Sequence, residues 1–449
     1  MRKARTAAGT AALALLGLVA TSTPAHADPL PAYVSAFLDS TITVGAHGAP
    51  GKTFRAWVIG VGATKARITF DLSGLAGVAT ATLPAQCTGG PKTRTCALPD
   101  TDDFSTRIPI ALTPVAGARA GATGALSYTT SADNAAAVTS TSTVVLADGV
   151  DLELGSSLVD GGRAVPGDRK TFRIGFANRG NRTARGFTIS FEFTHGVRPR
   201  AYQNCRSTER GSHHLATCSF AQDVPPGAEA TVPFGVAVTP DALGYQSVDF
   251  TVLATGEGLP PAVRATSRPD GQQLTARINP ATVRAAAELD SGDNYGVAQW
   301  SVASTYDVAA IGATVSGTVG GTVKVTVGVR NNGPGALDSS LSDDPVRVFG
   351  VTIPPGTKVT RAPASCAGLY TDADGDLVEA LPGKPGYRAY RCGPDAQFLG
   401  AGERLTVQFT LKVSRLGGVG SVSAVDPLGA DRPDSDQRND RARLVVKAG

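Results

Sequence analysis

The chain has 449 residues, of which 42% are hydrophobic and 18% are charged, and it contains 53 glycines and 29 prolines. This composition excludes collagen-like and bulk disordered chains, and the length exceeds what one hydrophobic core serves, which predicts about two to four domains. Without the three basic residues near its start, the chain has 39 Lys and Arg against 38 Asp and Glu. This near-neutral balance excludes a basic footprint for nucleic acid or an anionic membrane.

Residues 1–27 have the pattern of a cleaved secretory signal peptide. Basic residues precede an apolar run at 11–20, and Ala25-His26-Ala27 provides the small-x-small cleavage site before Asp28. The apolar run is about half as long as a transmembrane helix requires, and no later window of the sequence is apolar over that length. We therefore expect a secreted, extracellular protein without a membrane span.

Six cysteines lie in three close pairs along the chain. Six thiols allow many connectivities, but loop-closure entropy favours near neighbours and export favours disulfides. None of the pairs has the Cys-x-x-Cys spacing of a zinc site. We predict three sequential disulfides, each inside one domain and each worth about 2–4 kcal/mol. The predicted pairs are Cys87 with Cys96, Cys205 with Cys218, and Cys366 with Cys392.

The cysteine pairs set the register of a threefold repeat. Each copy opens with a glycine-containing turn and a strand, at Pro50-Gly51, Pro166-Gly167 and Gly320-Gly321. In the second and third copies the strand ends at Asn178-Arg179-Gly180 and Asn331-Asn332-Gly333, where Asn and Gly supply the positive φ of a tight reversal. Alternating apolar residues follow, which predicts strands with one buried face.

A second strand recurs after each cysteine pair. It begins 12, 14 and 13 residues after Cys96, Cys218 and Cys392. Pro109 and Pro233 occupy the same position in the first two of these strands, and because proline cannot donate to a ladder we expect the strand at a sheet edge. A turn rich in Asp and Asn then precedes a terminal strand in each copy.

Short alternating strands with frequent turn signals predict an all-β protein of Greek-key sandwiches. Only residues 281–289 have a helical pattern. The longer second copy carries an insertion, which we place near residues 256–287. The expected organisation is a signal peptide at 1–27 and three tandem sandwiches, at 28–148, 149–304 and 305–449, with joints near residues 148–149 and 304–305.

The second and third copies resemble the immunoglobulin-like repeats of bacterial surface proteins, a domain of unknown function related to the CARDB adhesion modules. The resemblance rests on the opening Asp151-Leu152 strand, the Pro-Gly turn, the Asn-x-Gly reversal and the closing Asp-x-Asp-x-x-Asn segment at 434–439. The first copy departs from it, with Gly60-Val61-Gly62 in place of the Asn-Gly turn. The resemblance implies immunoglobulin-like sandwiches that serve as spacers or adhesive units on exported bacterial proteins, and it supplies no catalytic residues.

Motifs of known catalytic sites are absent from the sequence. There is no Gly-x-Ser-x-Gly elbow, no His-Glu-x-x-His and no phosphate-binding glycine loop, so we expect no enzyme activity. His213 and His214 lie between Cys205 and Cys218. We interpret them as part of a solvated hairpin tip closed by the disulfide, with contact to a metal or an acidic ligand as the alternative.

An acidic run lies inside the third cysteine loop. Asp372, Asp374 and Asp376 alternate along the chain, and Glu379 adds a fourth carboxylate. Ca²⁺ takes six to eight such oxygen ligands, so calcium is the one cofactor hypothesis. The run departs from an EF-hand because Gly375 precedes the third Asp; the alternative is a hydrated acidic turn with Gly375 at positive φ.

The two tryptophans, Trp57 and Trp300, lie in alternating strands, and we expect both in the core. The sequence thus favours a secreted, non-catalytic structural or adhesive protein of a bacterial cell exterior. The alternative is a cell-wall or carbohydrate-binding protein that uses loops at the sandwich ends. The expected partners are a cell-wall polysaccharide or a surface protein.

Overall fold

The structure, a computed structural model, describes most of the chain. The described residues are 31–101, 103–159, 163–257, 272–279, 291–338, 349–393, 398–424 and 434–449. The predicted signal peptide (1–27) and the predicted helix (281–289) lie outside them, as does most of the predicted insertion (256–287). The described residues are all-β, with three short 3-10 turns.

Sandwich 1 is formed by the first ten strands. They are β1 (Tyr33–Phe37), β2 (Thr41–Gly45), β3 (Lys52–Val61), β4 (Arg67–Asp71), β5 (Ala79–Thr82), β6 (Cys87–Gly89), β7 (Thr93–Ala97), β8 (Asp103–Pro114), β9 (Thr123–Ala132) and β10 (Ala135–Ala147), with η1 (Ser73–Leu75) after β4. One sheet has the order β1-β3-β8-β5 and the other β2-β10-β9-β4-β7-β6. The first segment of the sandwich contributes to both sheets, because β1 pairs with β3 in one sheet and β2 runs parallel to β10 in the other. These orders are those of an immunoglobulin-like sandwich.

Sandwich 2 repeats this arrangement. Its elements are β11 (Leu152–Val159), β12 (Arg169–Asn178), β13 (Ala184–Phe193), β14 (Val197–Pro199), β15 (Cys205–Arg210), β16 (His213–Val224), β17 (Glu229–Val238), β18 (Tyr245–Ala254), β19 (Arg277–Asn279), η2 (Ser291–Asp293) and β20 (Tyr295–Ser301). The sheets have the orders β11-β12-β17-β14 and β15-β16-β13-β18-β20. β19 comes from the predicted insertion and pairs with β17, so this part of the insertion extends a sheet. Among the described residues, an isolated parallel bridge, Ala164 to Val302, joins the segments that follow β11 and β20.

Sandwich 3 has the same core order with a longer second sheet. Its elements are β21 (Val308–Ile311), β22 (Ala313–Gly317), β23 (Thr322–Asn331), β24 (Leu337–Asp338), β25 (Phe349–Thr352), β26 (Thr357–Arg361), β27 (Cys366–Thr371), β28 (Leu377–Glu379), β29 (Ala389–Cys392), β30 (Phe398–Leu399), β31 (Arg404–Val413), β32 (Val419–Ser423), η3 (Gln437–Asn439) and β33 (Arg441–Ala448). The sheets are β21-β23-β31-β26 and β22-β33-β32-β25-β29-β27-β28, and β24 pairs with β30. β22 runs parallel to β33, as β2 does to β10.

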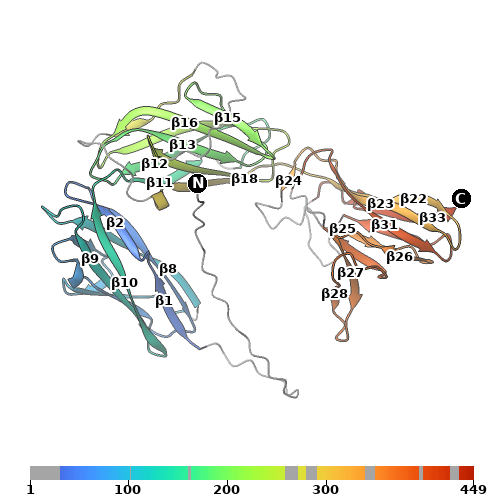
Figure 1. The fold of residues 1–449 in the computed structure, drawn as a ribbon, viewed down its shortest axis with the longest axis horizontal. Helices are drawn as coiled ribbons and strands as arrows, with labels where there is room; N and C mark the ends of the chain where they lie inside the picture. The colour runs from blue at the N-terminus through green and yellow to red at the C-terminus, as the bar shows by residue number, and fades with distance from the viewer. Residues whose placement is uncertain are drawn as a thin grey trace, which may run out of the picture.

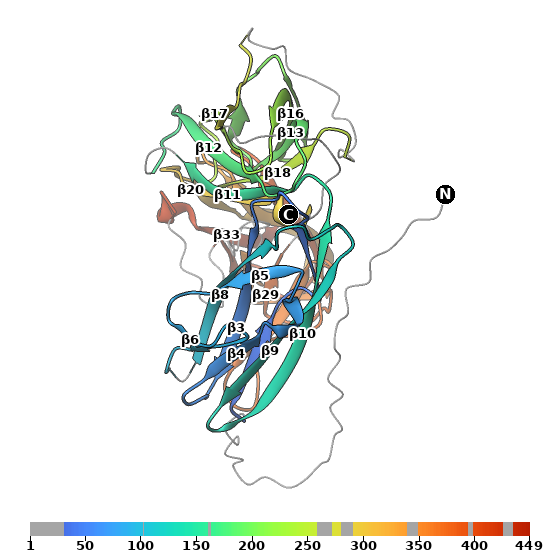
Figure 2. The ribbon, with the colours of Figure 1, turned by 90° about the vertical axis from the view of Figure 1, so that its left-hand side faces the viewer.

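The sandwiches follow one another along a bent chain. Figure 1 shows sandwich 2 at the top, with sandwich 1 at one end of it and sandwich 3 at the other; Figure 2, turned by 90°, shows sandwich 1 below sandwich 2. Both connections are short, because β10 ends at Ala147 and β11 begins at Leu152, while β20 ends at Ser301 and β21 begins at Val308. They contain the positions at which joints are predicted from the sequence.

Each sandwich encloses its own cluster of buried apolar side chains. The strands alternate in burial, as in β31, where every second residue from Val407 to Val413 is buried. Sandwich 2 has a core of packed phenylalanine rings, with the centroids of Phe191 and Phe234 4.2 Å apart. Burial of each such ring is worth about 1.5–3 kcal/mol, so each pair of sheets is held by its own core.

The three disulfides join directly opposed residues on neighbouring strands. They link Cys87 of β6 with Cys96 of β7, Cys205 of β15 with Cys218 of β16, and Cys366 of β27 with Cys392 of β29. This is the sequential pairing predicted above. One strand of each pair borders the inner strand β4, β13 or β25, so the disulfide occupies an equivalent place in all three sandwiches.

A buried asparagine closes the turn after β12. The side chain of Asn178 donates from Nδ2 to the carbonyls of Arg182 and Val224, at 2.7 and 2.8 Å. Its Oδ1 accepts from the backbone N–H groups of Gly180 and Asp151, at 3.0 and 3.2 Å. Asn178 is fully buried, so one side chain satisfies four backbone groups, three of them in buried hydrogen bonds.

The same contacts recur in sandwich 3 and in altered form in sandwich 1. Asn331 donates to the carbonyl of Gly335 at 2.7 Å and accepts from Gly333 at 3.1 Å. Sandwich 1 lacks the Asn-Gly turn, and there the exposed Asn134 donates to the carbonyl of Gly62 at 2.8 Å from the β9–β10 turn. The departure of the first copy from the sequence pattern is therefore compensated from another loop.

The edge position expected for the proline-containing strand is wrong. β8 lies between β3 and β5, and β17 lies between β12 and β14. However, β5 pairs only with residues 111–114 of β8, and β14 and β19 pair with residues 236–238 and 229–231 of β17. Pro109 and Pro233 therefore face gaps in the outer ladder, where the missing N–H is not needed.

We expect Asn178→Ala to destabilise the protein by at least about 2 kcal/mol, because it leaves buried backbone groups unpaired. Asn134→Ala is the matched control, since its partners are exposed to water, and it should cost less than about 1 kcal/mol. Urea unfolding of the two variants measures the difference. Equal losses would contradict the role assigned to the buried asparagine.

Candidate functional site

A buried lysine joins sandwich 1 to sandwich 2. The side chain of Lys52, the first residue of β3, is 3% exposed, and its Nζ lies 3.0 Å from Oδ1 of the fully buried Asp151. The same Nζ contacts Oδ2 of Asp293 in η2. A buried charge is stable only when it is paired. The contact therefore requires the two sandwiches to keep their relative position.

A second set of polar contacts holds this joint. The amide of Asn181 donates from Nδ2 to Oδ1 of Asp148 at 2.7 Å and to the carbonyl of His47 at 3.4 Å. Its Oδ1 accepts from the backbone N–H of Gly149 at 3.0 Å. The turn after β12 in sandwich 2 is thus bonded to the connection that precedes it, which limits bending between the sandwiches.

A cleft of about 650 Å³ lies in the angle between the two sandwiches. Arg55 of β3 lines it from sandwich 1, and residues of β11, β12 and β17 line it from sandwich 2. The charged residues of that second wall are Glu153, Arg173, Arg179 and Glu229. Arg179 Nε lies 2.8 Å from Glu153 Oε2, so these two charges offset each other.

An exposed aromatic cluster lies on the outer face of the sheet β1-β3-β8-β5. Phe37 and Trp57 are 49% and 46% exposed, and the exposed Tyr33 lies four positions from Phe37 along β1. Phe37 and Trp57 are register partners on β1 and β3. The centroids of their rings lie 5.5 Å apart. Large aromatic side chains that gather on a surface in this way are typical of binding surfaces.

The core position expected for Trp57 is wrong. Ala56 and Val58 point into the core and are fully buried, so the residue between them must face outward. Arg55 lies two positions before Trp57 and so faces the same side of β3. A charged residue on that side is the sequence signal that indicates an outward-facing Trp57. Trp300, in contrast, is 7% exposed and belongs to the core of sandwich 2, as expected.

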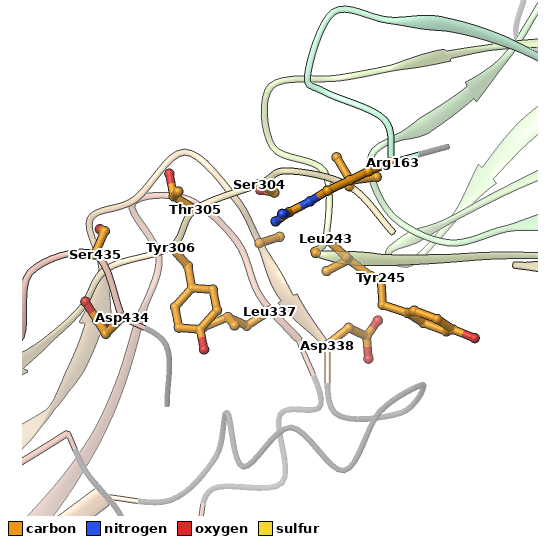
Figure 3. A pocket seen from close by; sticks show the side chains of 13 residues that line it. Arg163, Leu243, Tyr245, Ser304, Thr305, Tyr306, Leu337, Asp338, Asp434 and Ser435 are labelled. Atoms are coloured by element: carbon orange, nitrogen blue, oxygen red, sulfur yellow. The ribbon is translucent and has the colours of Figure 1, made fainter. Parts of the chain in front are cut away.

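A cavity of about 530 Å³ lies at the joint between sandwiches 2 and 3. Figure 3 shows side chains from both sandwiches around it, among them Arg163, Tyr245, Tyr306, Asp338 and Asp434. The carboxylate of Asp434 accepts hydrogen bonds from the backbone N–H groups of Val308 and Asp436, at 2.6 and 2.8 Å. This carboxylate therefore holds the start of β21.

A histidine and an aspartate meet at the same joint. His195 Nε2 lies 2.8 Å from Asp241 Oδ2, and the His195 ring lies 4.6 Å from the ring of Phe398 in sandwich 3. Burial acts to raise the pKa of Asp241, but hydrogen bonds from Thr239 and His195 outweigh it and hold this pKa below its usual value. The Thr239 hydroxyl donates a hydrogen bond to the Asp241 carboxylate. In a catalytic triad the nucleophilic hydroxyl is instead hydrogen-bonded to the histidine ring, so these three residues do not have the geometry of a triad.

The predicted histidine hairpin is formed by β15 and β16. His213 Nδ1 lies 2.8 Å from Glu192 Oε1, and His214 Nδ1 lies 3.7 Å from Glu209 Oε1. Burial lowers the pKa of His214. The disulfide at the base of the hairpin joins Cys205 and Cys218. His213 therefore contacts a carboxylate of the neighbouring strand β13, and His214 lies near a carboxylate of its own hairpin.

The predicted calcium ligands do not gather around one point. Asp372 Oδ1 accepts from the backbone N–H groups of Asp374 and Asp376, each at 3.0 Å. Glu379 Oε1 of β28 instead lies 2.6 Å from Arg391 Nη1 of β29, on the other side of β27 in the sheet. The Asp372 carboxylate therefore closes the turn, and the Glu379 carboxylate neutralises the guanidinium of Arg391.

The turn alternative fits this loop. Gly375 has φ +90°, a conformation that glycine adopts without strain. Across the described ranges, no group of three or more His, Cys, Asp or Glu residues is placed to hold a metal ion. Calcium binding by Asp372, Asp374, Asp376 and Glu379 gains no support from this geometry and stays a hypothesis. The described part of the chain also contains no helix with the length and apolarity of a membrane crossing.

Comparisons with known proteins give weak similarities. No protein family and no curated protein matches the chain. Among solved structures, Dpr2 Ig1–Ig2 in complex with DIP-Theta Ig1–Ig3 is 8% identical over 92% of this chain and 99% of that one, with a TM-score of 0.20. The Enterococcus faecalis MSCRAMM ACE, described as binding its ligands by the collagen hug model, is 9% identical over 66% and 95%, with a TM-score of 0.17. Trypsin-activated alpha-2-macroglobulin from Escherichia coli is 9% identical over 74% and 21%, with a TM-score of 0.21. Because these TM-scores are low, the fold is assigned from the strand order of the three sandwiches.

We expect calcium and EDTA to leave the melting temperature unchanged, because the carboxylates are engaged in separate contacts. Asp372→Ala should cost about 0.5–1.5 kcal/mol through the lost turn hydrogen bonds. Asp374→Ala is the control, since its carboxylate makes no hydrogen bond among the described residues, and it should change little. A rise of several degrees with calcium that Asp374→Ala removes would restore the calcium hypothesis.

Proposed function

We propose that this protein is a non-catalytic modular protein of a bacterial cell exterior that acts as a structural or adhesive element. The observation that carries the proposal is the tandem repetition of one disulfide-linked sandwich with short, polar, partly buried joints. The sequence supports export through the leader at 1–27 and adhesion through the resemblance of the second and third copies to surface-protein repeats. Rigid spacing of sandwiches suits a protein that holds a binding surface away from its attachment point.

A second candidate function, polysaccharide binding, is favoured by the exposed aromatic cluster. The sequence suggested loops at the sandwich ends as the binding elements, whereas Phe37 and Trp57 lie on a sheet face. The two candidates are compatible, because an adhesive protein needs a ligand-binding surface. A stiff joint beside that surface keeps it in a fixed orientation.

Adhesion is tested with the mature chain, residues 28–449, coupled to beads. We expect these beads to be retained by isolated cell envelopes of the source bacterium, and beads that carry the reduced and alkylated protein to be retained less. Counting bound beads by microscopy gives the measurement. Equal retention of the native protein and of an albumin control would contradict an adhesive role.

Stiffness of the first joint is tested by Lys52→Ala. Removing the cation from the buried Asp151 should cost about 3–5 kcal/mol and widen the distribution of molecular dimensions seen by small-angle X-ray scattering. Lys65→Ala is the control, because its ion pair with Asp133 is exposed and should be worth less than about 1 kcal/mol. Unchanged scattering and stability in Lys52→Ala would mean that the ion pair does not set the joint.

A further inference from the structure

The outer face of the sheet β1-β3-β8-β5 brings aromatic rings and arginines together. In the antiparallel register, Trp57 of β3 lies opposite Phe37 of β1 and opposite Arg107 of β8. Arg55 precedes Trp57 by two positions and faces the same side. Opposed side chains on one face of a sheet have Cβ atoms about 4.5–5.5 Å apart. These four residues therefore form one continuous surface, the aromatic–arginine face.

The indole of Trp57 is held in a defined orientation. Its Nε1 donates a hydrogen bond to the Ser105 hydroxyl at 2.8 Å, and the plane of the Phe37 ring is tilted by 40° from the indole plane. The side chain nevertheless stays 46% exposed. An exposed ring whose orientation is already fixed loses little conformational entropy when a ligand stacks on it.

The two arginines give this face a positive charge, and the carboxylates that line the cleft with Arg55 are Glu153 and Glu229 on its sandwich 2 wall. Both are exposed, and among the described residues neither Arg55 nor Arg107 forms an ion pair with a carboxylate. The acidic residue on the same side of β8 is Asp103, which pairs in register with Val61 at the far end of the strand. Asp103 lies four positions before Arg107 along the strand, a distance of about 13 Å.

We propose that the aromatic–arginine face binds an acidic polysaccharide, with sugar rings stacked on Trp57 and Phe37 and uronate carboxylates held by Arg55 and Arg107. This inference rests on the proposed adhesive function and names the ligand class of its binding surface. The C–H faces of a sugar ring are apolar and pack against the negative π face of an aromatic ring. A carboxylate matches the fork of donors on a guanidinium.

The surroundings of the face fit a long ligand. Arg55 also lines the cleft of about 650 Å³ between sandwiches 1 and 2, so the face continues into the angle of the bend. Figure 1 places β1 and β8 on the side of sandwich 1 that faces the inside of this bend. A polymer that crosses the sheet at Trp57 can thus continue along the cleft past Arg55.

The charge of the face disfavours a second copy of this chain as its occupant. A twofold contact uses the same surface on both partners. Two copies would therefore bring two sets of unpaired guanidinium groups into one dehydrated interface, which is costly. A polyanion removes this cost, because it supplies the missing carboxylates.

Binding is tested with the mature chain and polygalacturonate in affinity electrophoresis, with neutral dextran as the matched polymer. We expect polygalacturonate to retard the protein and dextran to leave its mobility unchanged. Trp57→Ala should weaken binding by about tenfold or more, as removal of a central aromatic anchor does. Arg55→Gln and Arg107→Gln should each weaken it and reduce its salt dependence. Tyr295→Ala and Arg443→Gln, which change an exposed tyrosine and an exposed arginine on other sheets, are the controls.

Fluorescence gives an independent readout, because Trp57 and Trp300 are the only tryptophans. Trp300 is buried and Trp57 is exposed, so acrylamide quenches mainly the emission of Trp57. Polygalacturonate should protect this emission from quenching in the wild-type protein and in Trp300→Phe. Unchanged mobility together with unchanged quenching would overturn the proposal.

Other outcomes also decide it. Equal binding of dextran, with no effect of the arginine variants, would contradict the acidic ligand. Concentration-dependent dimerisation that Trp57→Ala abolishes would assign the face to a second copy. If polygalacturonate fails to bind while beads still adhere to envelopes, the inference fails and the proposed adhesive function stands. If polygalacturonate binds but the beads do not adhere to envelopes, the polysaccharide site stands and the proposed adhesive function fails.

Discussion

The period of two along a strand is the constraint on which this molecule depends. In a sandwich one face of each sheet packs on the core, so every second side chain is committed to the outside. In β3 the buried Ala56 and Val58 fix this choice, and they leave Trp57 and Arg55 together on the outer surface. The same alternation that builds the core of sandwich 1 therefore also assembles its aromatic–arginine face.

Contacts at the two joints orient the three sandwiches relative to one another. Sandwich 1 is connected to sandwich 2 by only four residues between β10 and β11, and the buried contact of Lys52 with Asp151 removes much of the remaining freedom. At the other joint, His195 packs on the ring of Phe398. These contacts orient a surface on sandwich 1 relative to the rest of the chain, as the proposed adhesive function requires.

The fold was accessible from the sequence because its signals are local. Close spacing predicted the partner of Cys87, and Asn178 with Gly180 predicted the turn that a buried amide closes. To orient Trp57, one must know which face of β3 each alternate residue occupies. The prediction used hydrophobicity alone, and it therefore assigned Trp57 to the core. The partner of Lys52 lies 99 residues away in another sandwich, and no local pattern reports such a contact. Pairing of β19 with β17 depends in the same way on tertiary structure.

The parallel pairing of first and last strands has a mechanical meaning. When tension is applied to the two ends of sandwich 1, β2 and β10 are pulled past each other along their length, so their ladder hydrogen bonds share the load as they do in a lap joint. β22 and β33 give sandwich 3 the same resistance. In sandwich 2, the described residues form one isolated parallel bridge at the corresponding place, from Ala164 to Val302, beyond the ends of β11 and β20. On these described contacts, we expect the middle module to extend under a pulling force before either terminal module yields.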